Sequence, residues 1–356
     1  MSKASKVDKA HKSSKDVLVL AGDVGGTRAR FALFDAKGEA VHQEVLGSRE
    51  FDRFESAVGR FLSGAQKITK KATIAAASFG IAGPVVEGRV KTTNLPWVVD
   101  ATAVGKELGI AKVTLLNDLV AVGLGALAAA PNKLEVIHLG RPRTTGANVA
   151  VIAAGTGLGE AAFVWDGKRH VPLATEGAHV DFAPRTPTEE ALREELVREY
   201  GHVSYERVAS GSTIHVLYNF FVRSQKVAES KACAAHVLRA PDPNVAVVEL
   251  AEKGKSEAAM RALDLWASVY GAEASNLALK TLATGGVFVC GGASARLAKV
   301  LAKGFSARKS KGTSPFVDAF RDKGRMRPLV EKIPVAVLTE PLAGLLGAAS
   351  HAAAQL

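Results

Sequence analysis

The stretch VLVLAGDVGGTRARFALFD, residues 17–35, places two apolar runs on either side of Gly25-Gly26. The β-branched and aromatic residues in both runs predict a strand, a tight turn and a second strand. Asp23 stands out in this pattern, because an acid in a buried hairpin is unfavourable unless a cation or hydrogen-bond donors meet it. The hairpin therefore predicts both the start of a sheet and a polar site at one end of it.

A related pattern returns about 130 residues later, too far apart for a short-period repeat. NVAVIAAGTGLGEAAFVWDG, residues 148–167, again has an apolar run, a turn with a threonine among glycines, and a second apolar run. Between and after the two hairpins, helical patterns are predicted at 51–64, 118–130, 188–200, 340–356 and over much of 209–283. Hairpins interleaved with helices indicate an α/β chain with mixed sheets and two domains built alike.

The chain length also favours two domains, because 356 residues exceed the usual size of one hydrophobic core. We expect a disordered basic tail at 1–16 and a small α/β domain formed by 17–126 together with 339–356. A large α/β domain is expected at 127–338. A cleft between two domains is a natural place for a ligand.

Composition limits the partners and the compartment. Of the net charge of +11, nine charges lie in residues 1–15 and 305–332, which are predicted to be solvated surface or, alternatively, segments that bind nucleic acid or other anions weakly. No nucleic-acid-binding motif accompanies them, so no specific nucleic acid is expected. The longest apolar run, Leu119–Ala130, is too short to span a membrane. Two cysteines give no disulfide framework, which suits a reducing, cytoplasmic compartment.

Three glycine turns, Gly22–Thr27, Gly155–Gly159 and Gly291–Ser294, each follow an apolar strand. Glycine lets backbone N–H groups approach a polyphosphate closely. Each turn alone is compatible with an ordinary hairpin, but three together favour a nucleotide. Asp23 lies in the first turn and would need a metal beside a phosphate, so we expect it to orient Mg²⁺ mostly through water. The alternative is a turn aspartate bonded to its own backbone.

Polar residues elsewhere predict an acceptor rich in hydroxyl groups. Asn117 and Asp118 end an apolar strand before a helix, where Asp118 could act as general base or the pair could simply cap the helix. Glu176 and His179 flank two tiny residues, a pattern that suits a loop pressed against a small polar ligand. Glu206 precedes a predicted helix and is either a further ligand group or a surface acid. Together these residues favour a phosphotransferase.

Nine motifs in order now carry a resemblance that spans nearly the whole chain. They are GDVGGTRARFALFD, GIAGPV, TTNLPW, LLNDLVAVGLG, AAGTGLGEA, EGAHVDFAP, GHVSYERVASG, CGGAS and EPLAGLLGAA. As a set they resemble bacterial ATP-dependent glucokinases of the hexokinase group, within the actin-like sugar kinases. The resemblance implies two actin-like, ribonuclease H-like α/β domains around a central cleft. It further implies a homodimer that uses ATP and Mg²⁺ to convert glucose to glucose 6-phosphate.

The resemblance also assigns roles to the matching positions. Asp118 becomes the base that faces the sugar 6-hydroxyl, and Asp23 holds the Mg²⁺ shell. The residues expected to bind the other sugar hydroxyls or lie near the sugar are Asn94, Asn117, Glu176, His179 and Glu206. The residues expected to hold the nucleotide are Gly25, Gly26 and Thr27 in the first turn, Gly155, Thr156 and Gly157 in the second, and Gly291 with Gly292 behind the adenosine.

Relatives of the ROK type carry a cysteine-rich zinc motif, which Cys233 and Cys290 cannot form, so the chain resembles the non-ROK branch. Three alternatives stay open. A kinase for another hexose would share every motif. A sugar-sensing protein without catalysis could dispense with the base or a phosphate turn. A nucleotide hydrolase of the same fold would not need Glu176, His179 and Glu206.

Overall fold

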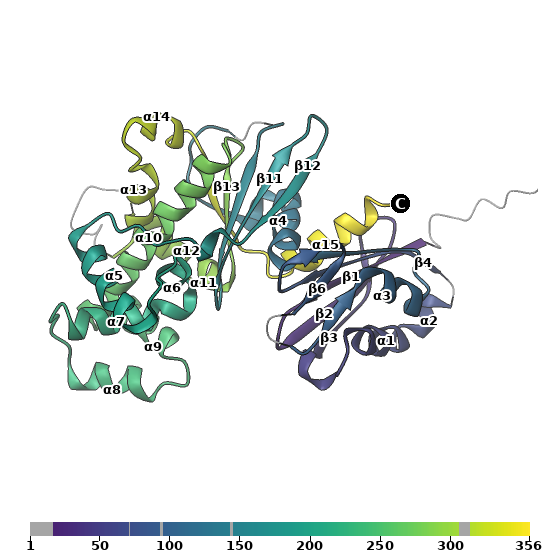
Figure 1. Cartoon of the computed structure of the whole chain (residues 1–356), viewed down its shortest axis with the longest axis horizontal. Helices are drawn as coiled ribbons and strands as arrows, with labels where there is room; N and C mark the ends of the chain where they lie inside the picture. Colours follow the sequence, from purple (N-terminus) through teal and green to yellow (C-terminus); the bar gives the residue numbers. More distant parts are fainter. Residues whose placement is uncertain (1–16, 71, 93–94, 143–144, 306–313) are drawn as a thin grey trace, which may run out of the picture. The chain divides into compact units, whose positions relative to one another are not determined.

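The computed structural model describes residues 17–70, 72–92, 95–142, 145–305 and 314–356 (Figure 1). The predicted basic tail at 1–16, the sugar-site candidate Asn94 and part of the basic stretch 305–332 lie outside the described residues. The described chain forms two compact units. The first runs to Ala128 and includes Leu342–Leu356, and the second is Ala129–Pro341.

The first unit is built on a five-stranded mixed sheet in the order β3-β2-β1-β4-β8. Its strands are β1 (Val17–Val24), β2 (Arg28–Phe34), β3 (Ala40–Gly47), β4 (Thr73–Ile81) and β8 (Lys112–Asn117). The predicted hairpin is present, since β1 pairs antiparallel with β2, and β1 also pairs parallel with β4. Parallel neighbours need a crossover, which brings helices onto the sheet faces.

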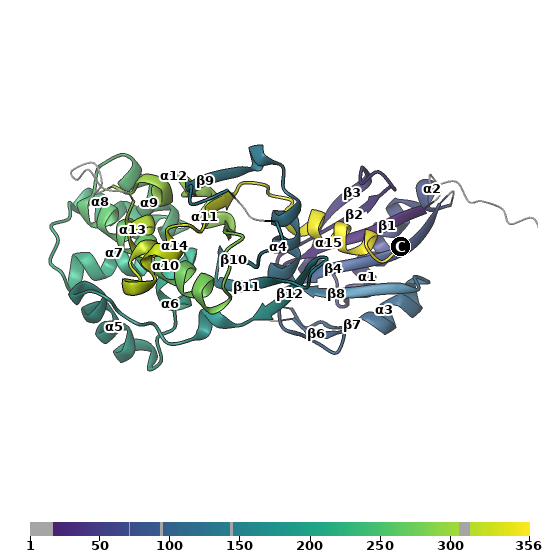
Figure 2. The ribbon, with the colours of Figure 1, turned by 90° about the horizontal axis from the view of Figure 1, so that it is seen from above.

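Helices cover both faces of this sheet. They are α1 (Phe54–Gly64), α2 (Gln66–Thr69), α3 (Ala101–Leu108), α4 (Asp118–Ala128) and α15 (Ala343–Ala353). On one face, Phe31, Phe54 and Phe79 form a buried aromatic cluster, with Phe54 and Phe79 edge to face at 5.0 Å. The other face is covered by α15, which packs along β1 and α4 (Figures 1 and 2).

The packing of α15 on α4 depends on two glycines. A Cβ at Gly347 would lie 1.8 Å from the carbonyl oxygen of Ala121, and one at Gly125 would lie 2.1 Å from that of Ala343. The C-terminal segment is thus part of the first unit, and its small residues allow the two helix backbones to approach closely.

A small second sheet in this unit has no counterpart in the sequence prediction. It consists of β5 (Val85–Val86), β6 (Arg89–Lys91) and β7 (Val98–Asp100). Strands of two or three residues are too short to show a hydrophobic period, so the sequence gives no signal for them.

The second unit contains a six-stranded sheet in the order β12-β11-β10-β13-β14-β9. Its strands are β9 (Leu134–His138), β10 (Val149–Ala154), β11 (Leu158–Trp165), β12 (His170–Thr175), β13 (Val287–Cys290) and β14 (Val335–Leu338). Its helices are α5 (Pro187–Tyr200), α6 (Glu206–Ala209), α7 (Ile214–Arg223), α8 (Lys231–Arg239), α9 (Pro243–Glu252), α10 (Glu257–Lys280), α11 (Gly292–Arg296), α12 (Ala298–Lys303), α13 (Pro315–Arg321) and α14 (Arg327–Val330).

The long helix α10 forms the centre of the core of this unit. It packs against α7, α9 and α13, and its Trp266 and Tyr270 are fully buried (Figure 1). The Tyr270 hydroxyl donates to the carbonyl of Ile152 and accepts from the N–H of Ala154, which ties the helix to β10. Hydrogen bonds from α10 in the core therefore fix the carboxyl end of β10.

The two sheets share one plan, as the repeat in the sequence predicts. In each, a hairpin, β1–β2 or β10–β11, adds a third antiparallel strand on one side. On the other side the first strand pairs in parallel with a second strand, which in turn pairs in parallel with a third: β1 with β4 and then β8, or β10 with β13 and then β14. The α/β class with mixed sheets is confirmed. In the described part of the chain, no helix has both the length and the apolar character needed to cross a membrane.

Candidate functional site

The first glycine turn differs from the expectation in one respect. It comprises Gly25 to Thr27, and the N–H of Gly25 donates to the carbonyl of Arg28 at 3.0 Å. Asp23 is not in the turn: it is the penultimate residue of β1 and pairs with Arg30 on β2. The placement of Asp23 in the turn is therefore wrong, because the apolar pattern hides how far β1 continues past it.

Asp23 is held in a polar niche of the first unit. Its Oδ2 lies 3.4 Å from Nη1 of Arg30, and its carboxyl group also lies against Gly344, where an added Cβ would come within 3.1 Å. Burial raises the pKa of Asp23, and Arg30 only partly opposes that shift. Because Arg30 does not fully offset the cost of burying this carboxylate, a nearby cation would stabilise its charged form.

A magnesium ion fits this niche only through water. The described residues contain no group of three or more His, Cys, Asp or Glu side chains that could hold a metal ion. Mg²⁺ keeps several of its waters and needs only one or two carboxylates beside substrate phosphates, so the single carboxylate of Asp23 is sufficient for the predicted role.

The second glycine turn is fixed by hydrogen bonds from two segments. The N–H of Gly155 donates to the carbonyl of Gly157, and the carbonyl of Gly155 accepts from the N–H of Gly211, both at 2.9 Å. The Ser212 hydroxyl donates to the carbonyl of Thr156 at 2.6 Å. The backbone N–H and carbonyl of Gly155 are thus both hydrogen-bonded, and Thr156 lies at the exposed tip of the turn.

This turn lines a cavity of about 610 Å³ in the second unit. The lining residues include three of the predicted nucleotide residues, Gly155, Thr156 and Gly292. The others are Gly211, Ser212, Ile214, Asp242, Asn244, Val245, Val248, Ala293, Arg296 and Leu297. The volume is in the range of small-ligand sites. Sequence reasoning missed Ser212, Asn244 and Arg296, because they lie outside the three predicted glycine turns and only the fold brings them to the cavity.

Gly291 has a structural task beside this cavity. It has a φ of +90°, and a Cβ there would lie 2.3 Å from the carbonyl of Ala154. Gly291 is absent from the lining residues, whereas Gly292 lines the cavity and has open space where a Cβ would be. The first glycine therefore lets β13 turn tightly against β10, and the second leaves room for a ligand.

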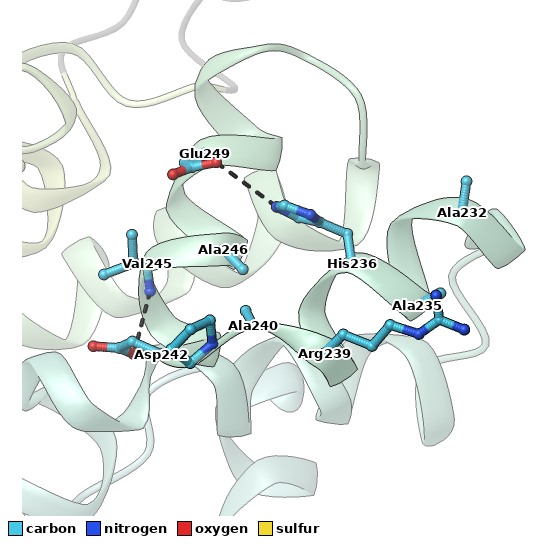
Figure 3. Close-up of a pocket in the computed structure, with 10 residues that line it drawn as sticks. Ala232, Ala235, His236, Arg239, Ala240, Asp242, Val245, Ala246 and Glu249 are labelled. Atoms are coloured by element: carbon cyan, nitrogen blue, oxygen red, sulfur yellow. Dashed lines mark hydrogen bonds and ion pairs between the residues drawn. The ribbon is translucent and has the colours of Figure 1, made fainter.

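A larger hollow of about 800 Å³ lies between α8 and α9 (Figure 3). Its polar groups include His236 and Glu249, which are 3.7 Å apart, and Arg239. None of the predicted site residues lines it. We assign the candidate site to the smaller cavity, because only that one contains the phosphate turn.

Three predicted acceptor residues lie together next to the same turn. His179 lies 3.8 Å from Glu176 and 3.9 Å from Glu206, measured between ring nitrogens and carboxylate oxygens. Oε2 of Glu206 accepts a hydrogen bond from the N–H of Leu158 at 3.0 Å, directly after the turn. The reading of Glu206 as a plain surface acid is therefore wrong, since its carboxylate binds the backbone of the turn.

The loop carrying these residues is attached to the segment before α6. Asp181 and Ser204 form a β-bridge, and the N–H of Tyr205 donates to the carbonyl of Val180 at 3.2 Å. The side chains of Glu176 and His179 remain more than half exposed. The result is a cluster of two acids and a histidine open to a small hydroxylated ligand.

Asn117 and Asp118 belong to the first unit, where β8 passes into α4. Oδ1 of Asn117 accepts from the N–H of Leu119 at 3.0 Å, and its Nδ2 donates to the carbonyl of Gly83 at 3.1 Å. The capping alternative thus holds for Asn117. Asp118 is the first residue of the helix itself and also accepts from the Leu119 N–H, at 2.9 Å.

Comparison with known proteins gives one consistent result. The Glucokinase family profile matches residues 20–355. Glucokinases from Trichormus variabilis and Synechocystis sp. are 35% and 36% identical to this chain, covering 94% of it and 99% and 97% of their own lengths.

Solved structures agree with this assignment. The crystal structure of a glucokinase from an Antarctic psychrotroph superposes with a TM-score of 0.77 at 30% identity, over 94% of this chain and 98% of that one. A ROK family glucokinase from Streptomyces griseus, crystallised with glucose and AMPPNP, has a TM-score of 0.60 at 20% identity and shows likeness of fold alone. The fold is that of the actin-like sugar kinases, and the chain belongs to the glucokinase family.

Proposed function

We propose that this chain is a glucokinase that transfers the γ-phosphoryl group of ATP to the 6-hydroxyl of glucose. The observation that carries the proposal is the hydrogen bond between Glu206 and Leu158, which joins the sugar-binding cluster to the phosphate turn of the same unit. Donor and acceptor sites that share one hydrogen bond are suited to direct transfer between two bound substrates.

The donor is ATP, held at the cavity that contains Gly155, Thr156 and Gly292. In the first unit, Gly25, Gly26 and Thr27 would face the phosphates, with Asp23 orienting Mg²⁺ through its waters. The metal supplies charge neutralisation for the transferring group. Gly291 supports the adenosine side of the cavity through the turn that it forms.

The acceptor is glucose. Glu176, His179 and Glu206 from the second unit, with Asn117 and Asn94 from the first, would bind its hydroxyls. Asp118 would take the proton of the 6-hydroxyl as that oxygen bonds to the γ-phosphorus and the bond to ADP breaks. The Oδ1 atom of Asp118 accepts a backbone N–H, which restrains the side chain in one orientation.

The test measures ADP and glucose 6-phosphate formation over a panel of hexoses, with and without Mg²⁺. We expect glucose to give the highest kcat/KM and Mg²⁺ to be required. A preference for mannose or fructose would make the chain a kinase of another hexose. Binding of glucose without turnover would indicate a sugar-sensing protein, and ADP release that ignores sugar would indicate a hydrolase.

We also propose that the chain belongs to the non-ROK branch. Cys233 lies in α8 and Cys290 in β13, both buried, which is unsuited to a cysteine-rich zinc motif. Full activity of protein prepared without zinc, with no zinc found by elemental analysis, is the expected result.

Finally, we propose a cytoplasmic homodimer, which is what resemblance to the bacterial enzymes implies. Light scattering at micromolar concentration should give twice the chain mass of 37.2 kDa. A mass equal to one chain at all concentrations would contradict the dimer.

A further inference from the structure

A buried carboxyl group lies directly beneath the proposed sugar-binding loop. Glu160 is on β11, opposite Thr175 of β12, and its side chain is only 2% exposed. Its Oε2 lies so close to Gly177 that an added Cβ would come within 2.4 Å of it. Gly177 directly follows Glu176 in the loop, so the Glu160 side chain packs directly beneath that loop.

Glu160 faces a second acid, Glu273 of α10, which is completely buried. Among the described residues, Oε1 of Glu160 has no donor that could satisfy it. A proton held between the two carboxyl groups would supply the hydrogen bond that joins Glu160 to Glu273. Two neighbouring carboxylates that are both buried cannot both stay ionised when water is excluded.

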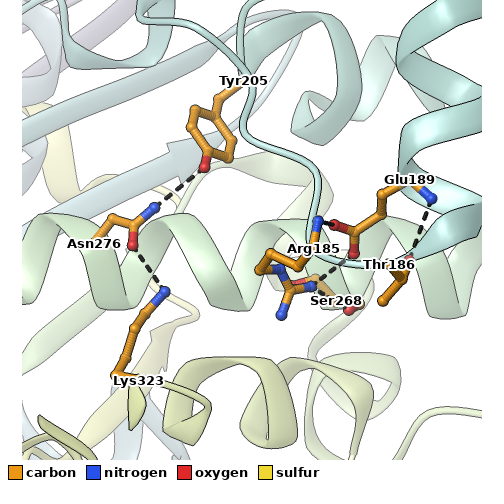
Figure 4. A network of polar contacts seen from close by, with 7 residues as sticks. All are labelled: Arg185, Thr186, Glu189, Tyr205, Ser268, Asn276 and Lys323. Atoms are coloured by element: carbon orange, nitrogen blue, oxygen red, sulfur yellow. Dashed lines mark hydrogen bonds and ion pairs between the residues drawn. The ribbon is translucent and has the colours of Figure 1, made fainter. Parts of the chain in front are cut away.

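Glu273 is also tied to the segment that carries Glu206. Nδ2 of Asn276 donates to Oε2 of Glu273 at 2.8 Å and to the hydroxyl of Tyr205 at 3.2 Å. Figure 4 shows Asn276 reaching Tyr205 on one side and Lys323 on the other, where Nζ donates to Oδ1 of Asn276 at 2.8 Å. Tyr205 directly precedes Glu206, so both parts of the sugar cluster rest on this network.

The positive charge around the pair is insufficient for two anions. Lys280 lies 3.5 Å from Glu273 but its side chain is 54% exposed, so water screens it. Lys323 donates its hydrogen bond to Asn276; its charge also acts on Glu273, but burial is the larger effect and lowers the pKa of its amino group. Arg185 is committed to Glu189 at 2.8 Å, as Figure 4 also shows. The hydroxyls of Tyr205 and Tyr270 also lie nearby; they are neutral at pH 7, and burial raises the pKa of both further.

We propose that Glu160 and Glu273 share one proton, and that this pair is the positioning element that holds the loop Glu176–His179 in its sugar-binding geometry. Glu160 touches no substrate; it acts through Gly177 and, by way of Glu273 and Asn276, through Tyr205. The proposal rests on the proposed function for its kinetic consequence, since the loop is the one assigned to glucose.

Loss of the shared proton should loosen the loop. Burial, together with the charge of Glu273, raises the pKa of Glu160 to about 8. Above that pH two buried anions would repel each other under Gly177, and the loop would move. Glucose KM should then rise with pH, by at most about tenfold per pH unit for one linked proton, while ATP KM changes less.

The test compares Glu160→Gln, Glu160→Ala and a matched control, Glu194→Gln, which removes an exposed acid on α5. Gln mimics the protonated carboxyl group, so glucose KM of this variant should equal that of the unmodified protein at pH 7 and lose its rise above pH 8. Ala should raise glucose KM at every pH with kcat and ATP KM little changed. The control should keep the unmodified pH profile.

A second readout needs no sugar and no turnover. Amide hydrogen exchange at residues 175–180 is compared between unmodified protein and Glu160→Gln at the same pH, so that chemical exchange cancels. We expect equal rates at pH 6.5 and faster exchange in the unmodified protein at pH 9. Identical exchange and identical KM profiles at both pH values would overturn the proposal, even if Glu160→Ala fails to fold. A protein that binds no hexose would refute the proposed function, yet the exchange measurement would still decide the proton pair.

Discussion

The carboxylate of Glu206 accepts a hydrogen bond from the backbone N–H of Leu158 at 3.0 Å, and this contact joins the two halves of the proposed reaction. Leu158 follows the glycine turn that lines the proposed nucleotide cavity, and Glu206 lies 3.9 Å from His179 of the proposed sugar cluster. In the proposed reaction Glu206 therefore has two roles: it would bind the sugar, and it accepts a hydrogen bond from the residue after the turn.

Substitutions of the two glycines of this turn should each affect the KM of a different substrate. A Cβ at Gly157 would lie 2.4 Å from Oε2 of Glu206, so Gly157→Ala should push that carboxylate away and raise glucose KM. A Cβ at Gly155 would meet no protein atom within 4 Å and would enter the cavity, so Gly155→Ala should raise ATP KM with glucose KM unchanged. Steady-state kinetics with each substrate varied in turn provides the measurement. The same effect from both variants would refute this division of roles.

Replacing Asp118 by Asn should abolish most of the turnover and preserve sugar binding. The amide has nearly the same shape but cannot take the hydroxyl proton, so kcat should fall by roughly 10²- to 10⁴-fold. Glucose affinity, measured by calorimetry, should stay within about threefold, since capping of α4 is carried by Asn117. Near-normal turnover would exclude Asp118 as the base.

Asp23→Asn should weaken the use of magnesium. The change removes the one carboxylate in the niche beside Arg30 and Gly344, so the Mg²⁺ concentration for half-maximal rate should rise by roughly tenfold or more. A matched control is Asp35→Asn, which alters a partly exposed acid just after the end of β2. An unchanged Mg²⁺ requirement in the Asp23 variant would show that another group orients the metal.

Stability of the first unit should depend on close contact between α4 and α15. Gly347→Ala would force a Cβ to within 1.8 Å of the Ala121 carbonyl, and we expect the free energy of unfolding to fall by about 1–3 kcal/mol. The control is Gly59→Ala in α1, where a Cβ meets nothing within 4 Å and better helix propensity should add about 0.5–1 kcal/mol. Urea unfolding measures both changes in the free energy of unfolding. Equal changes in the two variants would mean that α4 and α15 can move apart to admit the added methyl group.

The pH dependence of the free energy of unfolding should also reveal the buried proton. The pKa of Glu160 is raised in the folded protein from 4.5 to about 8, so the folded state binds more protons than the unfolded state between those values. This contribution is present in full below pH 4.5 and is lost as pH rises toward 8, by up to about 1.4 kcal/mol per pH unit. Glu160→Gln lacks it, so the variant should gain stability relative to unmodified protein between pH 5 and pH 8. A constant difference in Tm across that range would contradict the shared proton.

The sequence predicted the hairpins well because their signal is local. Apolar runs around Gly25-Gly26 and around Gly155–Gly157 form β1–β2 and β10–β11 as expected. The helix predicted at 188–200 is also present, yet it begins at Pro187 with Thr186 as its cap. Thr186 accepts from the N–H of Glu189 at 3.2 Å, a bond that depends on backbone geometry and not on composition.

Elements with weak local signals were missed. The helix α3 begins after the cap Asp100 and ends at Gly109, which has a φ of +68°. It is only eight residues long, and its apolar face is complete only when it packs beside β8. Edge strand β12 is mostly exposed, so the alternation that marks a half-buried strand is weak there.

By itself, the amino-acid sequence determined the chemistry: which acids, amides and glycine turns exist, and the order that assigns the chain to its family. Tertiary structure alone decided their neighbours, because hydrogen bonds between distant segments have no trace in local pattern. Only the fold brought Glu206 to the backbone of Leu158 and moved Asp23 out of its turn to face Arg30. Only the fold buries Glu160, an ordinary acid in the sequence, beside Glu273 of α10, and this burial raises the pKa of Glu160.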